Sequence, residues 1–156
     1  MIVVYHCWGG SHSSVTAASI HLGLLPTDHI PSKEEFLELG FYDRQWNVDH
    51  GKIFELGIDE YGNQICFMGR EFSGEIIERA IKGIGLIYGI APQEIKFVDA
   101  MPCVNLVMML GGSVSRALHL IAIGRPVVIK GTQQCYSKIV QLVAGVKGEF
   151  AGMTGT

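Results

Sequence analysis

The stretch from residue 2 to residue 14 constrains the fold of this chain more than any other segment. The apolar run at residues 2–6 predicts a buried strand, Gly9-Gly10 predicts a turn, and residues 13–23 follow with a helical pattern. The first N–H groups of a helix lack partners within it, and the helix dipole favours negative charge there. We therefore expect an α/β domain that binds a phosphate or a carboxylate at this turn.

The rest of the chain alternates between strand and helix patterns, with one candidate hairpin. We expect strands at 52–58, 63–68, 96–98 and 126–129, and helices at 32–39, from Ser73 onward, at 104–123 with a break at Gly111-Gly112, and at 132–145. Helical crossovers between strands favour a mainly parallel sheet. The predicted fold is a three-layer α/β/α domain of about five strands with an antiparallel hairpin edge, Rossmann-like or P-loop-like.

Length and composition limit the class of protein. At 156 residues we expect one domain over residues 1–156. Only 17% of the residues are charged against 48% apolar, which favours a homo-oligomer or a covered apolar face. The net charge is −3 and no basic cluster occurs, so nucleic acid is not an expected partner.

The cellular setting is predicted from what the sequence does not contain. No apolar segment approaches the length needed to span a bilayer, and no secretory leader is recognisable, so no membrane association is expected. The four cysteines are widely spaced without a CxxC pair. We therefore expect a cytoplasmic protein with reduced thiols.

Two segments carry weaker predictions. Residues 40–51 have no clear period but hold three aromatic and several charged side chains, which favours either a lid over a ligand or an oligomer contact. Residues 149–156 are expected to form a frayed tail.

Candidate site residues cluster after the predicted strands, because ligands of parallel sheets bind at the carboxyl ends of strands. Binding residues are expected among the glycines and serines of the first turn and at three other positions: Gly9, Gly10, Ser11, Ser13, Ser14, His6, Asn105 and Lys130. His12, Cys7 and Asp99 are the candidate catalytic residues. Gly111-Gly112 offers a second anion contact, with Arg116 one turn further on.

The first turn is not a Walker A loop, because no lysine occupies the required position. From Cys7 to Ser14 it is closer to the phosphatase loop CX5R[ST], in which a thiolate attacks phosphorus. The arginine position of that loop is held by Ser13. A capped helix packed against the sheet, with Cys7 as a small buried side chain, explains the same residues without chemistry.

The opening YHC-x-GG-x-HSS resembles an uncharacterised bacterial family, domain of unknown function 3189, and the resemblance extends over nearly the full length. It implies a small cytosolic protein, found chiefly in Gram-positive, often anaerobic and spore-forming bacteria. No established activity comes with it. It places seven residues in the family's pattern, namely His6, Cys7, Gly9, Gly10, His12, Ser13 and Ser14.

Three functions therefore stay open. The first is a domain that binds a phosphorylated small molecule or nucleotide at the turn ending at Ser14, with transfer or hydrolysis at the anion. The second is a thiol- or metal-dependent enzyme centred on His6, Cys7 and His12, although their spacing matches no common zinc pattern and no metal or cofactor is assigned. The third is a non-catalytic subunit or regulator, with the aromatic segment near Trp46 as a contact surface.

Overall fold

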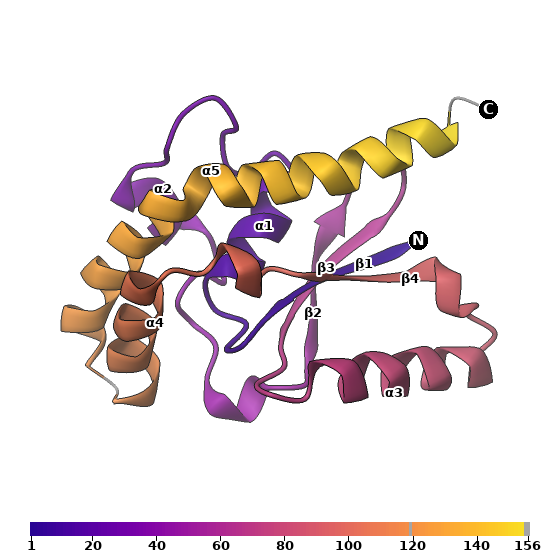
Figure 1. Ribbon diagram of the computed structural model, residues 1–156, viewed down its shortest axis with the longest axis horizontal. Coiled ribbons are helices and arrows are strands. Elements are labelled where there is room, and N and C mark those ends of the chain that lie inside the picture. The colour runs from indigo at the N-terminus through magenta and orange to yellow at the C-terminus, as the bar shows by residue number, and fades with distance from the viewer. Residues whose placement is uncertain (119, 155–156) are drawn as a thin grey trace.

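The computed structural model describes residues 1–118 and 120–154 and shows a mixed α/β chain built around one open sheet (Figure 1). The four strands lie in the order β2-β3-β1-β4. Their bounds are β1 Ile2–Cys7, β2 Ile53–Ile58, β3 Gln64–Gly69 and β4 Ile95–Asp99. The helices are α1 Ser13–His21, α2 Lys33–Glu38, α3 Gly74–Ile87, α4 Leu106–Gly112 and α5 Ile121–Thr154.

Strand β1 lies in the interior of the sheet and pairs in parallel with β3 on one side and β4 on the other. It is apolar almost throughout because both of its faces are covered. Val3 and Tyr5 point into one core cluster, whereas Val4 points into a second cluster on the opposite face. Side chains alternate along a strand, so Cys7 lies on the face of Tyr5 and His6 on the face of Val4.

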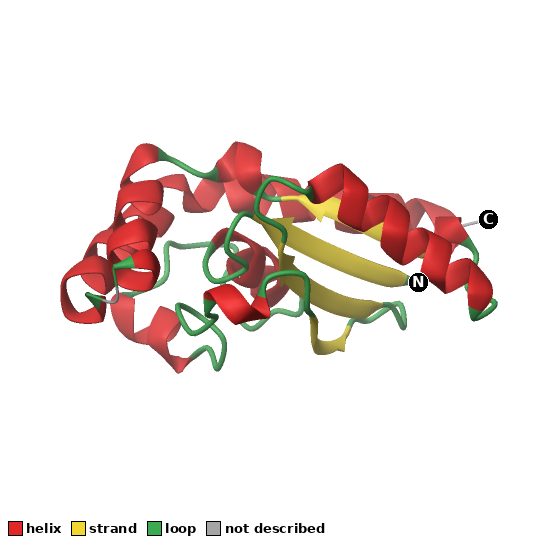
Figure 2. Ribbon diagram, turned by 90° about the horizontal axis from the view of Figure 1, so that it is seen from below, coloured by secondary structure: helices red, strands yellow, loops and turns green. Residues whose placement is uncertain are grey.

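Helices cover the two faces of the sheet separately (Figure 2). Helices α1 and α5 pack on the face of Tyr5, where Val15, Ile139 and Val143 join the larger cluster. On the other face, Ile77 and Ile81 of α3 pack against the smaller cluster around Val4. The long α5 and α3 thus lie on opposite sides of the strands in Figure 1.

The hairpin prediction is confirmed, because β2 pairs antiparallel with β3 at the edge of the sheet. The cap predicted at Ser32 is also present. Its hydroxyl accepts from the N–H of Glu35 at 3.2 Å, and its own N–H donates to the Glu35 carboxylate at 2.8 Å. This reciprocal pair satisfies two N–H groups at the start of α2.

The predicted strand at residues 126–129 is wrong, and the sheet has four strands rather than about five. These residues belong to α5, which spans 34 residues and contains Pro126. A short apolar run does not distinguish a strand from a buried helical segment, and here Val128 and Ile129 are the buried face of a helix. Lys130 consequently does not follow a strand.

The helical region predicted at 104–123 is divided, and the α-helical part ends at the second of the two glycines. Helix α4 ends at Gly112 and passes directly into a π-helical turn over Ser113–Ala117. Gly111 allows α4 to pack tightly on α5, because a Cβ there would lie 2.4 Å from the backbone nitrogen of Val128. The glycine is therefore explained by close helix packing.

Residues 40–51 form turns and a short 3₁₀ segment at Asn47–Asp49. Tyr42 is buried, and its hydroxyl lies 2.7 Å from that of Thr132 on α5. At the other end of the chain, residues 149–154 continue α5 instead of fraying, and residues 155–156 of the predicted tail lie outside the described residues. No helix within residues 1–118 and 120–154 is both long and apolar enough to cross a lipid bilayer.

Candidate functional site

Cys7 lies at the end of β1, where the loop that follows folds back over its sulfur. The N–H of Gly10 donates to Cys7 Sγ at 3.2 Å, and the Ser14 hydroxyl lies 3.2 Å from the same atom. Gly10 is required here because its φ is +68° and a Cβ would lie 2.4 Å from the backbone nitrogen of Gly69. Two hydrogen-bonding groups thus lie against the Cys7 sulfur.

The start of α1 adjoins this loop. Within the described part of the chain, no side chain caps the first turn of α1. Ser11, a potential cap, instead directs its hydroxyl at the carbonyl of Gln45, 3.4 Å away. The first N–H groups of a nine-residue helix therefore lack side-chain partners next to Cys7.

A cavity of about 440 Å³ opens above Cys7 and the start of α1. Its polar lining includes Ser11, His12, Ser13, Gln45, His50, Ser113 and Arg116, and its apolar lining includes Trp8, Phe72, Met101, Val104, Met108 and Met109. The first turn predicted from the sequence is therefore one wall of a real cavity, which α4 and the π-helical turn close from the other side.

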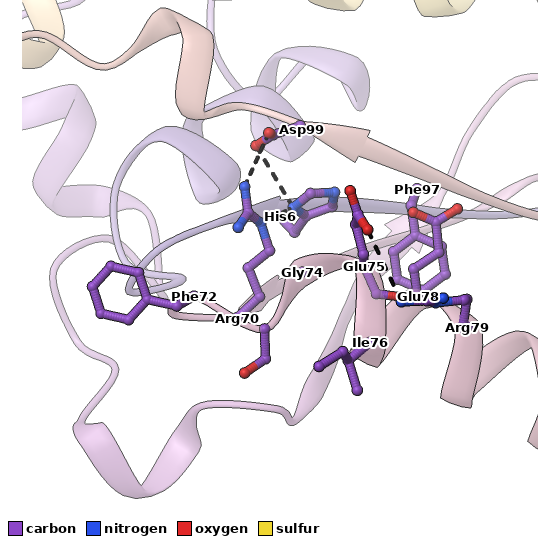
Figure 3. A pocket seen from close by; sticks show the side chains of 11 residues that line it. His6, Arg70, Phe72, Gly74, Glu75, Ile76, Glu78, Arg79, Phe97 and Asp99 are labelled. Carbon is purple, nitrogen blue, oxygen red and sulfur yellow. Dashed lines mark hydrogen bonds and ion pairs between the residues drawn. The ribbon is translucent and has the colours of Figure 1, made fainter.

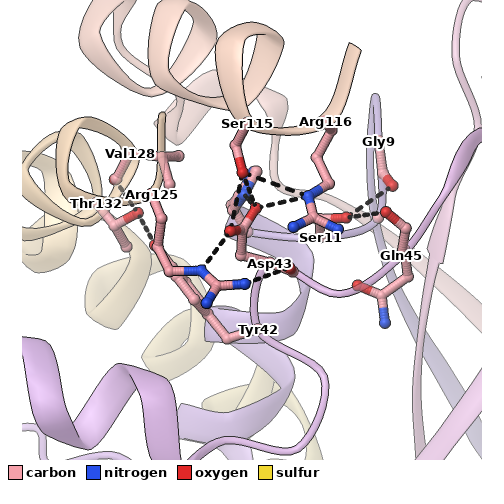
Figure 4. A network of polar contacts seen from close by, with 12 residues as sticks. Gly9, Ser11, Tyr42, Asp43, Gln45, Ser115, Arg116, Arg125, Val128 and Thr132 are labelled. Carbon is pink, nitrogen blue, oxygen red and sulfur yellow. Dashed lines mark hydrogen bonds and ion pairs between the residues drawn. The ribbon is translucent and has the colours of Figure 1, made fainter. Parts of the chain in front are cut away.

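His12 is held by the buried carboxylate of Asp43, which Figure 4 shows together with Ser115, Arg116 and Arg125. Its Nε2 donates to Asp43 Oδ1 at 3.0 Å, and Asp43 is fully buried. The same carboxylate accepts from the Ser115 hydroxyl at 2.9 and 3.0 Å and from Arg125 Nε at 2.8 Å. It also forms an ion pair with Arg116, whose Nε lies 2.9 Å from Oδ1. One carboxylate thus joins the loop at 40–46 to α1, the π-helical turn and α5.

The electrostatics of Asp43 follow from these contacts. Burial raises its pKa, but hydrogen bonds from His12 and Arg125, together with the charges of His12 and Arg116, lower it by more. The pKa therefore lies well below its ordinary value, and the carboxylate is ionised at neutral pH. A buried anion of this kind fixes the orientation of the imidazole that donates to it.

The sequence predicted Asp43 only as one of the polar residues of the possible lid at 40–51, and it predicted no role for Arg125. Arg116 was expected near a second anion contact, and the structure places it in the wall of the same cavity as Cys7. Its guanidinium lies 4.8 Å from the ring centroid of Trp46. No local sequence signal pairs these residues, because Ser115, Arg116 and Arg125 all lie more than seventy residues beyond Asp43.

His6 and Asp99 lie in a different cavity, of about 600 Å³, on the α3 side of the sheet (Figure 3). Arg70 joins them: its Nε donates to His6 Nδ1 at 2.7 Å and its terminal NH2 donates to Asp99 Oδ2 at 3.0 Å. Burial lowers the pKa of His6, and Arg70 adds to that effect, whereas Asp99 opposes it. His6 also lies on the face of the sheet opposite Cys7, in a separate cavity.

The two remaining predicted ligand-binding residues lie away from both described cavities. The Asn105 side chain caps α4, accepting from the N–H of Met108 at 2.8 Å and donating to the carbonyl of Gly131 at 2.9 Å. Lys130 is exposed on α5, because the segment before it is helical. The position of Lys130 follows from the change of the strand predicted at 126–129 into the long helix.

A metal site gains no support from the side chains that the structure describes. Across residues 1–118 and 120–154, no three His, Cys, Asp or Glu side chains are grouped closely enough to hold an ion. His6 faces away from Cys7 and His12, so the three proposed ligands do not converge.

The chain belongs to the family described as Protein of unknown function (DUF3189), whose model matches residues 2–148. The resemblance predicted from the opening motif is thereby confirmed. Searches of curated proteins and of solved structures found no match.

Proposed function

We propose that the cavity above Cys7 binds a phosphate-bearing small molecule and that Cys7 acts on its phosphoryl group, giving hydrolysis or transfer. One observation carries the proposal: the sulfur receives the Gly10 N–H and contacts the Ser14 hydroxyl beside an uncapped helix start. The same N–H groups that stabilise a thiolate also favour an anionic substrate.

In the proposed reaction the Cys7 thiolate attacks phosphorus, the phosphorus–oxygen bond of the ester breaks, and a thiophosphate forms on Cys7. The leaving alkoxide takes a proton from His12. Water, deprotonated by His12, then attacks the thiophosphate and releases inorganic phosphate and the thiolate. If an alcohol replaces water, the outcome is transfer.

His12 suits the acid and base steps because Asp43 fixes one of its ring nitrogens. With Nε2 donating to the carboxylate at 3.0 Å, Nδ1 is the nitrogen left to exchange a proton with substrate. The buried charge of Asp43 stabilises the imidazolium that donates to the leaving group.

Arg116 supports the phosphate assignment despite the serine at the arginine position of the CX5R[ST] loop. It lines the cavity from the π-helical turn, and its Nε is fixed 2.9 Å from Asp43 Oδ1. A guanidinium placed in this way offers further N–H donors to phosphate oxygens.

The finer fold assignment belongs to the same proposal. We infer a three-layer, Rossmann-like or P-loop-like domain, because β3, β1 and β4 run parallel and separate helices cover the two faces. Such domains bind nucleotides and phosphates at the carboxyl end of the first strand, where Cys7 lies. This part is analogy of fold and does not by itself identify the substrate.

The proposal is tested by measuring phosphate release from a panel of monoesters, with mass spectrometry of the quenched reaction. Wild-type protein is expected to release phosphate and to carry a phosphoryl group on Cys7, and Cys7→Ser is expected to do neither. Cys66→Ala is the matched control, since Cys66 is buried on the opposite face of the sheet. Equal phosphate release by Cys7→Ser would remove Cys7 from the reaction.

A second candidate function is a non-catalytic subunit or homo-oligomer. The observation that favours it is exposed apolar surface around α4 and the start of α5, where Leu106 is 74%, Leu110 66% and Ile123 63% exposed. Exposed apolar residues gathered in this way are common at protein contacts. Light scattering during gel filtration tests it, and a concentration-independent monomeric mass would count against it.

A further inference from the structure

The mouth of the Cys7 cavity is built from aromatic rings, which the catalytic steps do not require. Trp8 lies edge-to-face with His50 at 5.5 Å between ring centroids and with Phe72 at 6.2 Å. All three line the cavity, yet Phe72 is 91% exposed and Trp8 42% exposed. An aromatic side chain that is almost wholly exposed beside a cavity can bury apolar surface when a ligand binds.

Hydrogen bonds hold together the backbone that carries these rings. The carbonyl of Trp8 accepts from the N–H of Glu71 at 2.9 Å, and the N–H of Trp8 donates to Met101 Sδ at 3.2 Å. Glu71 in turn holds His50, with Oε1 2.6 Å from Nδ1. The ring of His50 and the backbone beside Trp8 and Phe72 are thereby joined, which lowers the cost of ordering them on binding.

The wall facing the rings is made of flexible apolar side chains. Met101, Met108 and Met109 line it, together with Val104. Thioethers adapt to flat surfaces and make favourable contacts with aromatic rings. A ring entering between this wall and Trp8 would meet apolar groups on both of its faces.

Resting on the proposed function, we propose that the substrates are phosphate monoesters of aromatic alcohols, with the phosphate at the start of α1 and the aromatic ring at Trp8 and Phe72. A sugar would place several hydroxyls against thioethers and rings, where the lining offers few hydrogen-bond partners. A flat aromatic ring needs no hydrogen-bond partners, and it gains contacts with the rings of Trp8 and Phe72.

The test compares two monoesters that each carry a six-carbon ring, the aromatic phenyl phosphate and the saturated cyclohexyl phosphate. The quantity compared is the concentration at which each protects Cys7 of the whole chain from alkylation. Phenyl phosphate is expected to protect at the lower concentration, and Phe72→Ala to reduce that preference about two- to tenfold. Tyr88→Ala is the matched control, because Tyr88 is 80% exposed at the far end of α3. A tyrosine-phosphorylated peptide in the same assay separates a protein substrate from a free aryl phosphate.

The outcomes separate the two proposals. Equal protection by both esters, with inorganic phosphate also protecting, would overturn the aromatic preference and leave the phosphate site intact. A preference that Phe72→Ala leaves unchanged would equally overturn the assignment of the ring to this rim. If neither the esters nor inorganic phosphate protects Cys7, the proposed function fails and the substrate class fails with it.

Discussion

Asp43 and His12, from a loop and from the residue before α1, share a hydrogen bond of 3.0 Å between Oδ1 and Nε2. The carboxylate is fully buried, and its backbone has a φ of +52°, which a residue other than glycine rarely adopts. The loop therefore takes up a strained conformation at the residue that orients the candidate acid–base group.

Replacing Asp43 by Asn is expected to destabilise the protein by about 3–5 kcal/mol, because Arg116 and Arg125 would then lack their buried anion. Chemical denaturation measures the change. The lowered pKa of Asp43 means that its stabilisation is complete above its unfolded value, about pH 4, and is lost as the pH falls through the folded value. Asp28→Asn, whose side chain is 85% exposed, should not shift the midpoint.

His21 should make the protein less stable on acidification at a higher pH than the range in which Asp43 becomes protonated. This residue is fully buried between the Tyr5 hydroxyl, 2.8 Å from Nδ1, and Asp59 Oδ2, 3.0 Å from Nε2. Burial lowers its pKa despite the opposing effect of Asp59. As the pH falls, His21 therefore takes up its proton at a higher pH in the unfolded chain than in the folded protein. The free energy of unfolding is consequently greatest above about pH 6.5 and falls as the pH drops below it.

The contribution of His21 is measured by its ring resonances during an NMR titration, alongside denaturation at each pH. A ring that titrates at or above the ordinary histidine value would contradict the account. His29→Gln is the control, since His29 is 58% exposed and should leave the slope of stability against pH almost unchanged.

Gly112→Ala should disturb catalysis more than folding. A Cβ at this position would lie 3.2 Å from His12 Cε1 and 3.4 Å from Nδ1, so the imidazole must move. Alanine also favours a helix over glycine, which offsets part of the strain. We expect a near-normal melting temperature with phosphate release lowered at least several-fold. Gly145→Ala, with open space around it on α5, should leave turnover unchanged.

Cys7 should be the first of the four cysteines to react with iodoacetamide. Burial raises the pKa of both Cys66 and Cys135 to about 11, and it also raises that of Cys103. Peptide mapping after brief alkylation identifies the labelled residue. Ser14→Ala should slow labelling of Cys7, since the hydroxyl 3.2 Å from Sγ is lost. Labelling of Cys66 before Cys7 would contradict this ranking.

The sequence predicted those parts of the fold that local patterns determine. The first strand, the hairpin, the Ser32 cap and the helix after Ser73 all match observed elements. The run at 126–129 failed because Val and Ile favour strands locally, while packing of α4 against α5 keeps them helical. That single error also misplaced Lys130.

The sequence predicted only the part of the candidate site that lies between Cys7 and Ser14. Residues close in sequence, from Cys7 to Ser14, could be placed together because a strand and a helix joined by a short turn must be neighbours. The side of the strand on which Cys7 lies could not be predicted, since a shift of one residue reverses it. Asp43, Arg116 and Arg125 meet only through tertiary packing, so no local pattern pairs them.

The central claim is that an anion binds beside the Cys7 sulfur, and phosphate protection tests it most directly. The rate of Cys7 alkylation is measured in the whole protein with inorganic phosphate and with chloride at equal ionic strength. Our account predicts that millimolar phosphate slows the reaction and that Arg116→Gln weakens the protection. An alkylation rate that is the same in phosphate and in chloride would contradict it.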